Sequence, residues 1–263
     1  MKNILLFTVL LSFFACREIA PTIPPLGDKK VLVEEFTGVR CVNCPAGASE
    51  LDDLTALYGD RLVIVSIHAG DFAPPYSDSK FDFRTSEGTE LEKLVGSPIG
   101  YPAAVINRRK FTGQERLQVF RTSWAGFISE ESKAPSVLTL GFVKNLNKTT
   151  RELSLDVKTI PTQALQGDIR LSVMLTENGV KDQQETPQGK KADYNHKHIF
   201  RKMLTKFDGD PLSISSINEP ISKNFTLKIP QNWVLENCQI VAFIHKGGIE
   251  KDVLQVNEIK ISD

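Results

Sequence analysis

The pattern of apolar residues changes once along this chain, near residues 133–136, and that change constrains the fold more than any other feature. Between residues 30 and 133, short apolar runs alternate with helical patterns, as where "RLVIVSIHAG" (61–70) is followed by "GTELEKLVG" (88–96). A continuous apolar run fits a strand that is covered on both faces. The order of strand, helix, strand, helix, strand pair and helix predicts an α/β layer domain over residues 30–133.

From Pro135 onward, strand patterns follow one another with turn residues between them and without long helices. Apolar and polar residues alternate in "RELSLDVK" (151–158), "DIRLSVML" (168–175) and "NFTLKIP" (224–230). Several short strands separated by turns predict a β-sandwich of the immunoglobulin-like kind. We expect it to cover residues 134–263, with a long insertion at 178–222.

The last helix of the first half has its own start signal. Thr112 and Glu115 have the spacing of a capping box, which satisfies the free N–H groups of a first helical turn. Apolar residues follow on one helical face, and they include Phe120, Trp124 and Ile128. The sequence therefore predicts a helix that starts near residue 112.

The N-terminus has the layout of an export signal. Lys2 precedes the apolar run "ILLFTVLLSFFA", which is shorter than the about 20 residues that a membrane-spanning helix needs. The run ends at "FFAC" and looks like a bacterial lipoprotein signal over residues 1–15, with acyl chains such as palmitate on Cys16. The alternative is an ordinary cleaved signal with a free Cys16. Residues 16–29 are rich in proline and predict an extended tether.

The charge balance limits the partners of the chain. Its 32 Lys and Arg residues match its 32 Asp and Glu residues, and no basic stripe marks a nucleic-acid surface. We therefore expect no nucleic-acid partner, no cofactor, and membrane attachment only through the lipid on Cys16.

The stretch "GVRCVNCPAG" (38–47) places Cys41 and Cys44 two residues apart, after a strand and at the start of a helix. The N–H groups and positive dipole end of a helix stabilise a thiolate, and Arg40 would lower the thiol pKa further. This pattern favours a redox dithiol in which Cys41 attacks and Cys44 resolves. A structural disulfide and a zinc site shared with His68 stay open, although a structural zinc site normally needs four ligands.

Other candidate residues have both a functional and a structural interpretation. His68 ends the strand at 61–70 and lies either near the dithiol or in a structural hydrogen bond. His196 and His198 have a spacing that could bind metal from a strand, or they are packing residues. Cys238 stands in the apolar run "NCQIVAFIHK", which predicts a buried small hydrophobic residue.

The segment "VEEFTGVRCVNCP", together with Tyr101-Pro102 before "AAVIN", resembles the thioredoxin superfamily. The resemblance implies a thioredoxin-like fold over residues 30–133 and a cis Pro102 beside the dithiol. It also implies that Glu35 is a buried carboxylate that assists proton transfer, although a purely structural buried acid stays open. The chain departs from the superfamily pattern at Arg40, where a tryptophan is usual, and in its Val-Asn spacer.

The whole chain resembles the Omp28-like lipoproteins of Gram-negative bacteria, through "EEFTGVRCVNCPAG", "IHAGDF", "GYPAAVINR" and "DYNHKHIFRKML". The resemblance implies a lipid-anchored protein of the outer membrane, on its periplasmic or its outer face. One function that follows is thiol–disulfide oxidoreductase activity on the thiols or disulfides of exported proteins, carried by Cys41, Cys44, Glu35 and Pro102. The alternative is a non-catalytic binding or structural lipoprotein that uses the first domain as a scaffold.

Overall fold

The computed structural model describes residues 28–214 and 216–262. The predicted signal peptide, Cys16 and most of the tether lie outside these residues. Within the part of the chain that is described, no helix is long and apolar enough to cross a membrane.

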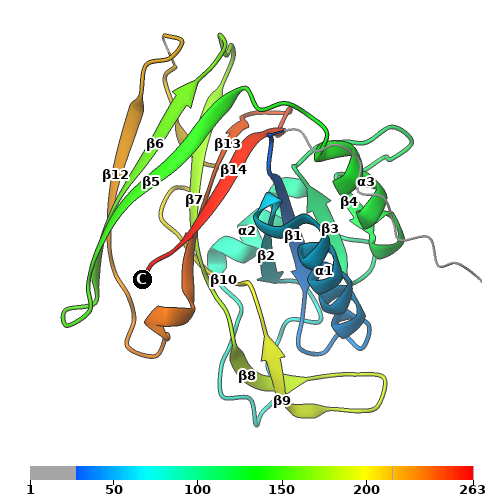
Figure 1. The fold of residues 1–263 in the computed structure, drawn as a ribbon. Coiled ribbons are helices and arrows are strands. Elements are labelled where there is room, and N and C mark those ends of the chain that lie inside the picture. The colour runs from blue at the N-terminus through cyan, green and yellow to red at the C-terminus, as the bar shows by residue number, and fades with distance from the viewer. Residues whose placement is uncertain (1–27, 215, 263) are drawn as a thin grey trace, which may run out of the picture.

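A nine-stranded mixed sheet runs through the whole molecule (Figure 1). Its strands are ordered β14-β13-β7-β10-β2-β1-β3-β4, and β11 pairs with β7. The strands come from both sides of residue 133, with these bounds: β1 Val31–Thr37, β2 Leu62–His68, β3 Ala103–Ile106, β4 Gln118–Phe120, β7 Ile169–Glu177, β10 Ile199–Met203, β11 Asp210–Pro211, β13 Cys238–Lys246 and β14 Val253–Lys260.

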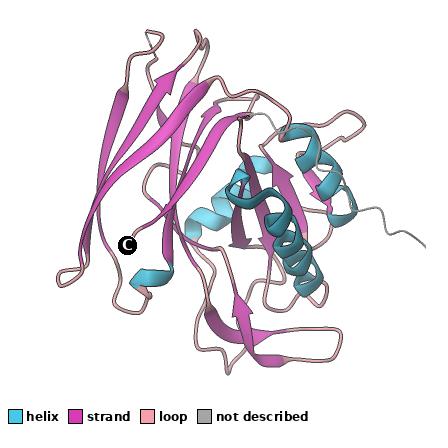
Figure 2. Cartoon of the chain, in the orientation of Figure 1, coloured by secondary structure: helices cyan, strands magenta, loops and turns pink. Residues whose placement is uncertain are grey.

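Two smaller sheets complete the strand layers. A three-stranded sheet of order β12-β6-β5 packs against the β7, β13 and β14 end of the large sheet, across a core of Leu, Ile and Val side chains (Figures 1 and 2). A two-stranded arm, β8-β9, projects beyond the end of β7 and the start of β10, at the bottom of Figure 1. The bounds are β5 Leu138–Asn147, β6 Glu152–Pro161, β8 Val180–Gln184, β9 Lys191–His196 and β12 Ile221–Lys228.

Helices cover both faces of the β1–β4 part of the large sheet. On one face, α1 and α3 bury Leu51, Leu54 and Trp124 against Val31 and Val33 of β1. On the other face, α2 packs on a core that β2 shares with β10 and β13. The helices are α1 Cys44–Tyr58, α2 Ser86–Val95 and α3 Trp124–Glu131, with short 3₁₀ turns at Gly59–Arg61, Arg121–Ser123 and Leu235–Asn237.

The predicted fold class, an α/β thioredoxin-like domain followed by a separate immunoglobulin-like sandwich, is wrong. Strand β10 lies parallel to β2, with Ile199 opposite Ser66, and the Ser66 N–H donates to the His198 carbonyl at 2.7 Å. The sheet of the first half therefore continues into β7, β13 and β14 of the second. Every residue of β2 is buried. A continuous apolar sequence predicts such burial, but it does not predict which strand lies beside β2.

The predicted helix starting near residue 112 is also wrong at its beginning. Gly113 takes a left-handed φ of 80° in a turn, and residues 118–120 form the edge strand β4. The helix starts only at Trp124, whose indole N–H donates to the Val119 carbonyl at 3.1 Å. The capping-box spacing is thus not used, because the chain first returns to the sheet.

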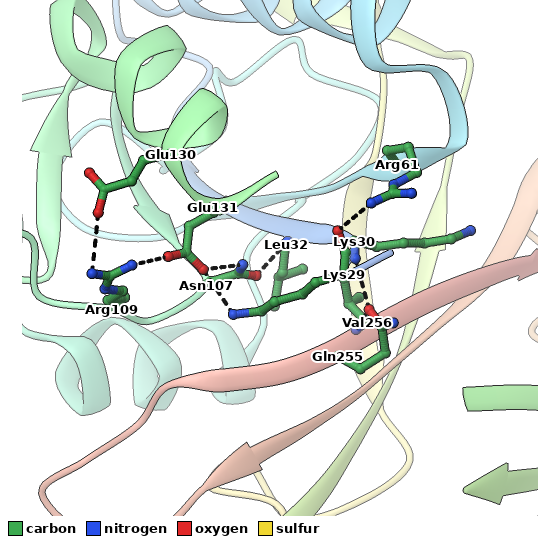
Figure 3. A network of polar contacts seen from close by, with 10 residues as sticks. All are labelled: Lys29, Lys30, Leu32, Arg61, Asn107, Arg109, Glu130, Glu131, Gln255 and Val256. Carbon is green, nitrogen blue, oxygen red and sulfur yellow. Dashed lines mark hydrogen bonds and ion pairs between the residues drawn. The ribbon is translucent and has the colours of Figure 1, made fainter. Parts of the chain in front are cut away.

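A polar network fixes the first described residues against α3 and the turn after β3 (Figure 3). The Glu131 carboxylate accepts from Lys29 Nζ at 2.9 Å, from Asn107 Nδ2 at 2.8 Å and from Arg109 Nη1 at 2.5 Å. Burial alone would raise the pKa of Glu131, but these donors outweigh it and lower that pKa. Nearby, the Lys30 N–H donates to Gln255 of β14 at 2.9 Å, so both halves of the chain meet here.

Candidate functional site

The loop 38–43 carries the chain from β1 to α1, and its backbone passes very close to the neighbouring 71–73 segment. A Cβ atom on Gly38 would lie 2.3 Å from the Phe72 carbonyl, so only glycine fits. The Arg40 N–H then donates to the same Phe72 carbonyl at 3.0 Å. Helix α1 begins at Cys44, with Pro45 in its first turn, where a missing N–H costs nothing.

Cys41 and Cys44 are joined in a disulfide, with their Cα atoms 5.4 Å apart. Both residues are only 3% exposed. The sequence predicted that Cys41 attacks and Cys44 resolves, and an attacking thiol must be open to its partner. The structure buries both alike, although it places Cys44 in the first helical turn as expected.

Two segments bind the loop. The Arg40 guanidinium donates to the Pro74 and Pro75 carbonyls at 2.8 and 2.6 Å and stacks on the Tyr76 ring. Arg40 is therefore engaged with the 74–76 segment, whereas the sequence suggested that it acts on the thiols.

The second segment is the β8-β9 arm. Gln184 Nε2 donates to the Cys41 carbonyl at 3.0 Å, and the Glu185 N–H donates to the Val39 carbonyl at 2.7 Å. Gln184 was not predicted as a site residue. The sequence indicates only an insertion at 178–222, and no pattern in that insertion predicts where it folds back.

Glu35 lies beneath the first turns of α1. Ser66 Oγ donates to its Oε2 at 2.7 Å, while Oε1 has no hydrogen-bond partner. Burial raises the pKa of Glu35 to about 7, against the opposing effect of the Ser66 hydrogen bond. A carboxyl with such a pKa can both give and take a proton near neutral pH.

Pro102 lies beside the same helical turns. The Tyr101–Pro102 peptide bond is cis, as the resemblance implied. A Cβ atom on Gly47 would lie 2.7 Å from Pro102 Cγ and 3.2 Å from Glu35 Oε1. The structure thus brings together, around the start of α1, the four residues that the sequence grouped: Glu35, Cys41, Cys44 and Pro102.

A cavity of about 280 Å³ lies on the inner side of this site, between α1, the sheet and the arm. It is lined mainly by polar side chains and by Cys44, and three histidines meet in its wall. The lining residues are Glu35, Thr37, Cys44, Pro45, Ala48, Ser49, Leu51, Asp52, Ser66, His68, Gln184, Tyr194, Asn195, His196, Lys197 and His198.

The three histidines of the cavity are neutral at neutral pH. Burial lowers the pKa of His68 well below its usual value, and it lowers the pKa of His196 and of His198 to about 4. The His68 and His196 rings lie 5.7 Å apart. Among the described residues, no group of three or more His, Cys, Asp or Glu side chains is arranged to hold a metal ion.

An open groove of about 400 Å³ lies at a different side of α1, over Pro102. Asn43, Ala46, Tyr101 and Phe120 are among its lining residues, and Phe120 is half exposed. Cys238 lines neither space; it is free and fully buried, which confirms its prediction as a small hydrophobic residue, and burial raises its pKa to about 12.

The comparisons with known proteins identify the family. The family model of the outer membrane protein Omp28 matches residues 92–263. The chain belongs to the Omp28 family. This is a family of outer membrane proteins. The Omp28 match includes Pro102 and the arm, whereas Glu35, Cys41 and Cys44 precede it.

The solved structures that resemble this chain are distant from it in sequence. HBP35 of Porphyromonas gingivalis superposes with a TM-score of 0.71 at 16% identity, over 90% of this chain and 76% of that one. Protein AGR_C_4864 from Agrobacterium tumefaciens gives a TM-score of 0.55 at 14% identity, over 89% and 96%. A domain of the outer membrane lipoprotein Omp28 from P. gingivalis gives 0.34 at 17% identity, over 48% and 88%. No curated protein matches the chain.

Proposed function

We propose that this Omp28 family lipoprotein works by binding an exported protein at the outer membrane, with Cys41–Cys44 as a brace for the loop beside the binding surface. The observation that carries the proposal is that both cysteines are only 3% exposed. The 74–76 segment and the β8-β9 arm hold the loop beside them. Exchange with a protein disulfide needs a sulfur that the partner's sulfur can reach. A buried pair fits a structural bridge better.

Apolar side chains around the Pro102 groove support the binding role. Val42, Phe72 and Phe120 are large, exposed apolar residues close to the disulfide loop or the groove. Exposed apolar residues that gather on one surface are typical of protein interaction sites. The groove over Pro102 is therefore the surface where we expect the partner.

Site-specific photocrosslinking in cells tests this role. A photoreactive residue at Phe120 should give a discrete crosslinked band, while the same residue at Ile249, the most exposed of the large apolar side chains, should give none. The Cys41→Ser/Cys44→Ser variant, compared at equal protein level, should keep the Phe120 band. Loss of that band would show that partner binding at the groove depends on the disulfide.

Thiol–disulfide exchange is the second candidate, and Glu35 is the observation that favours it. A carboxyl with a pKa of about 7 beneath the disulfide suits proton transfer to and from a thiol. In this function Cys41 attacks, Cys44 resolves, and the Pro102 groove receives the substrate. The Cys44→Ser variant should then trap exported proteins in complexes that a reductant releases, and the Cys41→Ser variant should trap none.

Attachment through Cys16 remains a prediction, because this residue lies outside the described part of the chain. If the lipid is on Cys16, Cys16→Ser should leave the protein unprocessed or release it from the membrane fraction. Unchanged mass and unchanged partition into detergent would contradict attachment at this residue.

A further inference from the structure

The disulfide meets the inner cavity through one of its two cysteines. On the outer side, the loop is held by Arg40, while Gln184, which donates to the Cys41 carbonyl, itself lines the cavity. On the inner side, Cys44 lines the 280 Å³ cavity, and Cys41 is absent from the described residues that form its wall. The two cysteines thus differ in their contact with the cavity, although they are equally buried.

The cavity reaches the surface at an ion pair. Asp52 and Lys197 both line it, and Lys197 Nζ lies 2.8 Å from Asp52 Oδ2. Both side chains are about half exposed, at 48% and 45%. This surface pair joins α1 to the segment after β9, and exposed pairs of this kind are weak.

We propose that this cavity is an entry route for low-molecular-weight thiols, which attack the disulfide at Cys44 and so open the brace. The size of the cavity admits a small organic molecule, whereas the polypeptide of a protein reductant cannot enter a space of about 280 Å³ behind α1. In this route the incoming thiol reacts with Cys44, whereas in the second candidate function the partner reacts with Cys41. It goes beyond the proposed binding function and does not depend on it.

The chemistry of the step is ordinary thiol exchange. A small thiol loses its proton to the buffer, and its thiolate attacks the Cys44 sulfur along the line of the existing bond. The bond from the small thiol to Cys44 forms as the Cys41–Cys44 bond breaks, and Cys41 leaves as a thiolate that takes up a proton from water or from Glu35. A second small thiol then releases Cys44, so two small thiols are oxidised to their disulfide as the protein disulfide is reduced.

Helix α1 offers a matched pair of variants that separates the two routes. Ala48 lines the inner cavity, whereas Ala46 lines the open groove over Pro102. The rate of reduction of the full-length protein by 2-mercaptoethanol should fall about 10-fold in Ala48→Leu and stay unchanged in Ala46→Leu, since reaction at a disulfide depends on access. A protein dithiol of thioredoxin size should reduce the wild-type protein far more slowly per thiol than 2-mercaptoethanol does.

The contrary results are distinct. A slower reaction in Ala46→Leu would place the route over Pro102, and equal rates in all three proteins would show that the cavity is not used. A faster reaction in Ala48→Leu would mean that reduction follows unfolding. Each of these results overturns the entry route and leaves the binding function untouched.

A second measurement keeps the proposal testable if Ala48→Leu does not fold. In the native Cys41→Ser variant the remaining Cys44 should be alkylated by iodoacetamide at least about 10-fold faster than Cys41 in the Cys44→Ser variant, as access dictates. Both variants should react alike in guanidinium chloride. Faster alkylation of Cys41 in the folded state would overturn the proposal.

Discussion

Glu34 and Arg108 form a buried two-point ion pair that helps to hold the two halves of the molecule together. Arg108 Nη2 lies 2.6 Å from Glu34 Oε1, and Arg108 Nε donates to Oε2 at 2.8 Å. The side chains are 0% and 1% exposed. The guanidinium also stacks on Phe243 of β13, at 4.8 Å from the ring centroid, so a pair from the first half of the chain is covered by the second.

Breaking this pair should be costly, because the remaining partner would be a charge without water or counter-ion. We expect Arg108→Met to lower the free energy of unfolding by about 3–5 kcal/mol. Replacing both residues, as Glu34→Leu/Arg108→Met, should recover most of that loss, since no buried charge then remains. Denaturant titrations of the wild type and both variants measure these differences. A double variant as unstable as Arg108→Met would show that packing rather than charge dominates.

The shared sheet predicts that both halves of the chain unfold together. Each half of the chain carries one tryptophan reporter: Trp124 begins α3, and Trp233 lies in the loop before β13. The variants Trp124→Phe and Trp233→Phe each keep a single tryptophan. In each variant, the denaturant transition reported by that tryptophan should coincide with the transition reported by circular dichroism, as two-state unfolding requires. Transitions with separate midpoints would instead support the sequence-based boundary at residues 133 and 134 as a boundary between independent folding units.

The elements of the chain were easier to predict than their arrangement. Apolar patterns identified the strand within residues 61–70 and the helix near residues 88–96, because each pattern reports the burial of side chains within a few residues. The pairing of Ser66 with Ile199 was not predictable in this way. It depends on contacts between residues 133 positions apart in sequence, which leave no local pattern. The fold class was wrong for this reason.

The candidate site shows the same division. Cys41, Cys44, Glu35 and Pro102 were grouped from short motifs, and the structure places them around one helical turn. The arm that carries Gln184 and covers the loop could not be found, because its polar strands resemble any solvated hairpin. Without the arm, the sequence indicated an open Cys41, and this is the point at which the inferred chemistry and the structure differ most.

The close approach of Gly47 to Pro102 predicts a steric effect that can be separated from helix propensity. A methyl group on Gly47 would lie 2.7 Å from Pro102 Cγ, whereas one on Gly126 of α3 meets nothing within 4 Å. Gly126→Ala should therefore stabilise the protein by about 0.5–1 kcal/mol, the usual gain from alanine inside a helix. Gly47→Ala should instead destabilise it by about 1–3 kcal/mol, because the turn must move away from the proline. Thermal unfolding of the two variants provides the comparison, and a stabilising Gly47→Ala would show that Pro102 yields easily.

The pKa of Glu35 predicts how stability depends on pH above neutrality. Because this pKa is raised from 4.5 to about 7 in the folded state, the folded protein binds the proton more tightly than the unfolded chain. Protonated Glu35 therefore contributes to the free energy of unfolding. This contribution, about 3 kcal/mol in total, is fully present below pH 4.5 and is lost as pH rises through 7. Glu35→Gln, which cannot ionise, should abolish this loss.

The histidines act in the opposite direction and in a lower range of pH. His196 and His198 have folded pKa values of about 4, below their usual 6.5, so their contribution is lost as pH falls from 6.5 toward 4. The two effects therefore oppose one another at pH 4.5–6.5, and the Glu35 effect stands alone above pH 6.5. Denaturant titrations of the wild type and Glu35→Gln from pH 6.5 to 8.5 should show a stability difference that grows with pH in favour of the variant. A constant difference over this range would mean that Glu35 already carries its charge in the folded protein, and it would remove the proton-transfer role on which the second candidate function depends.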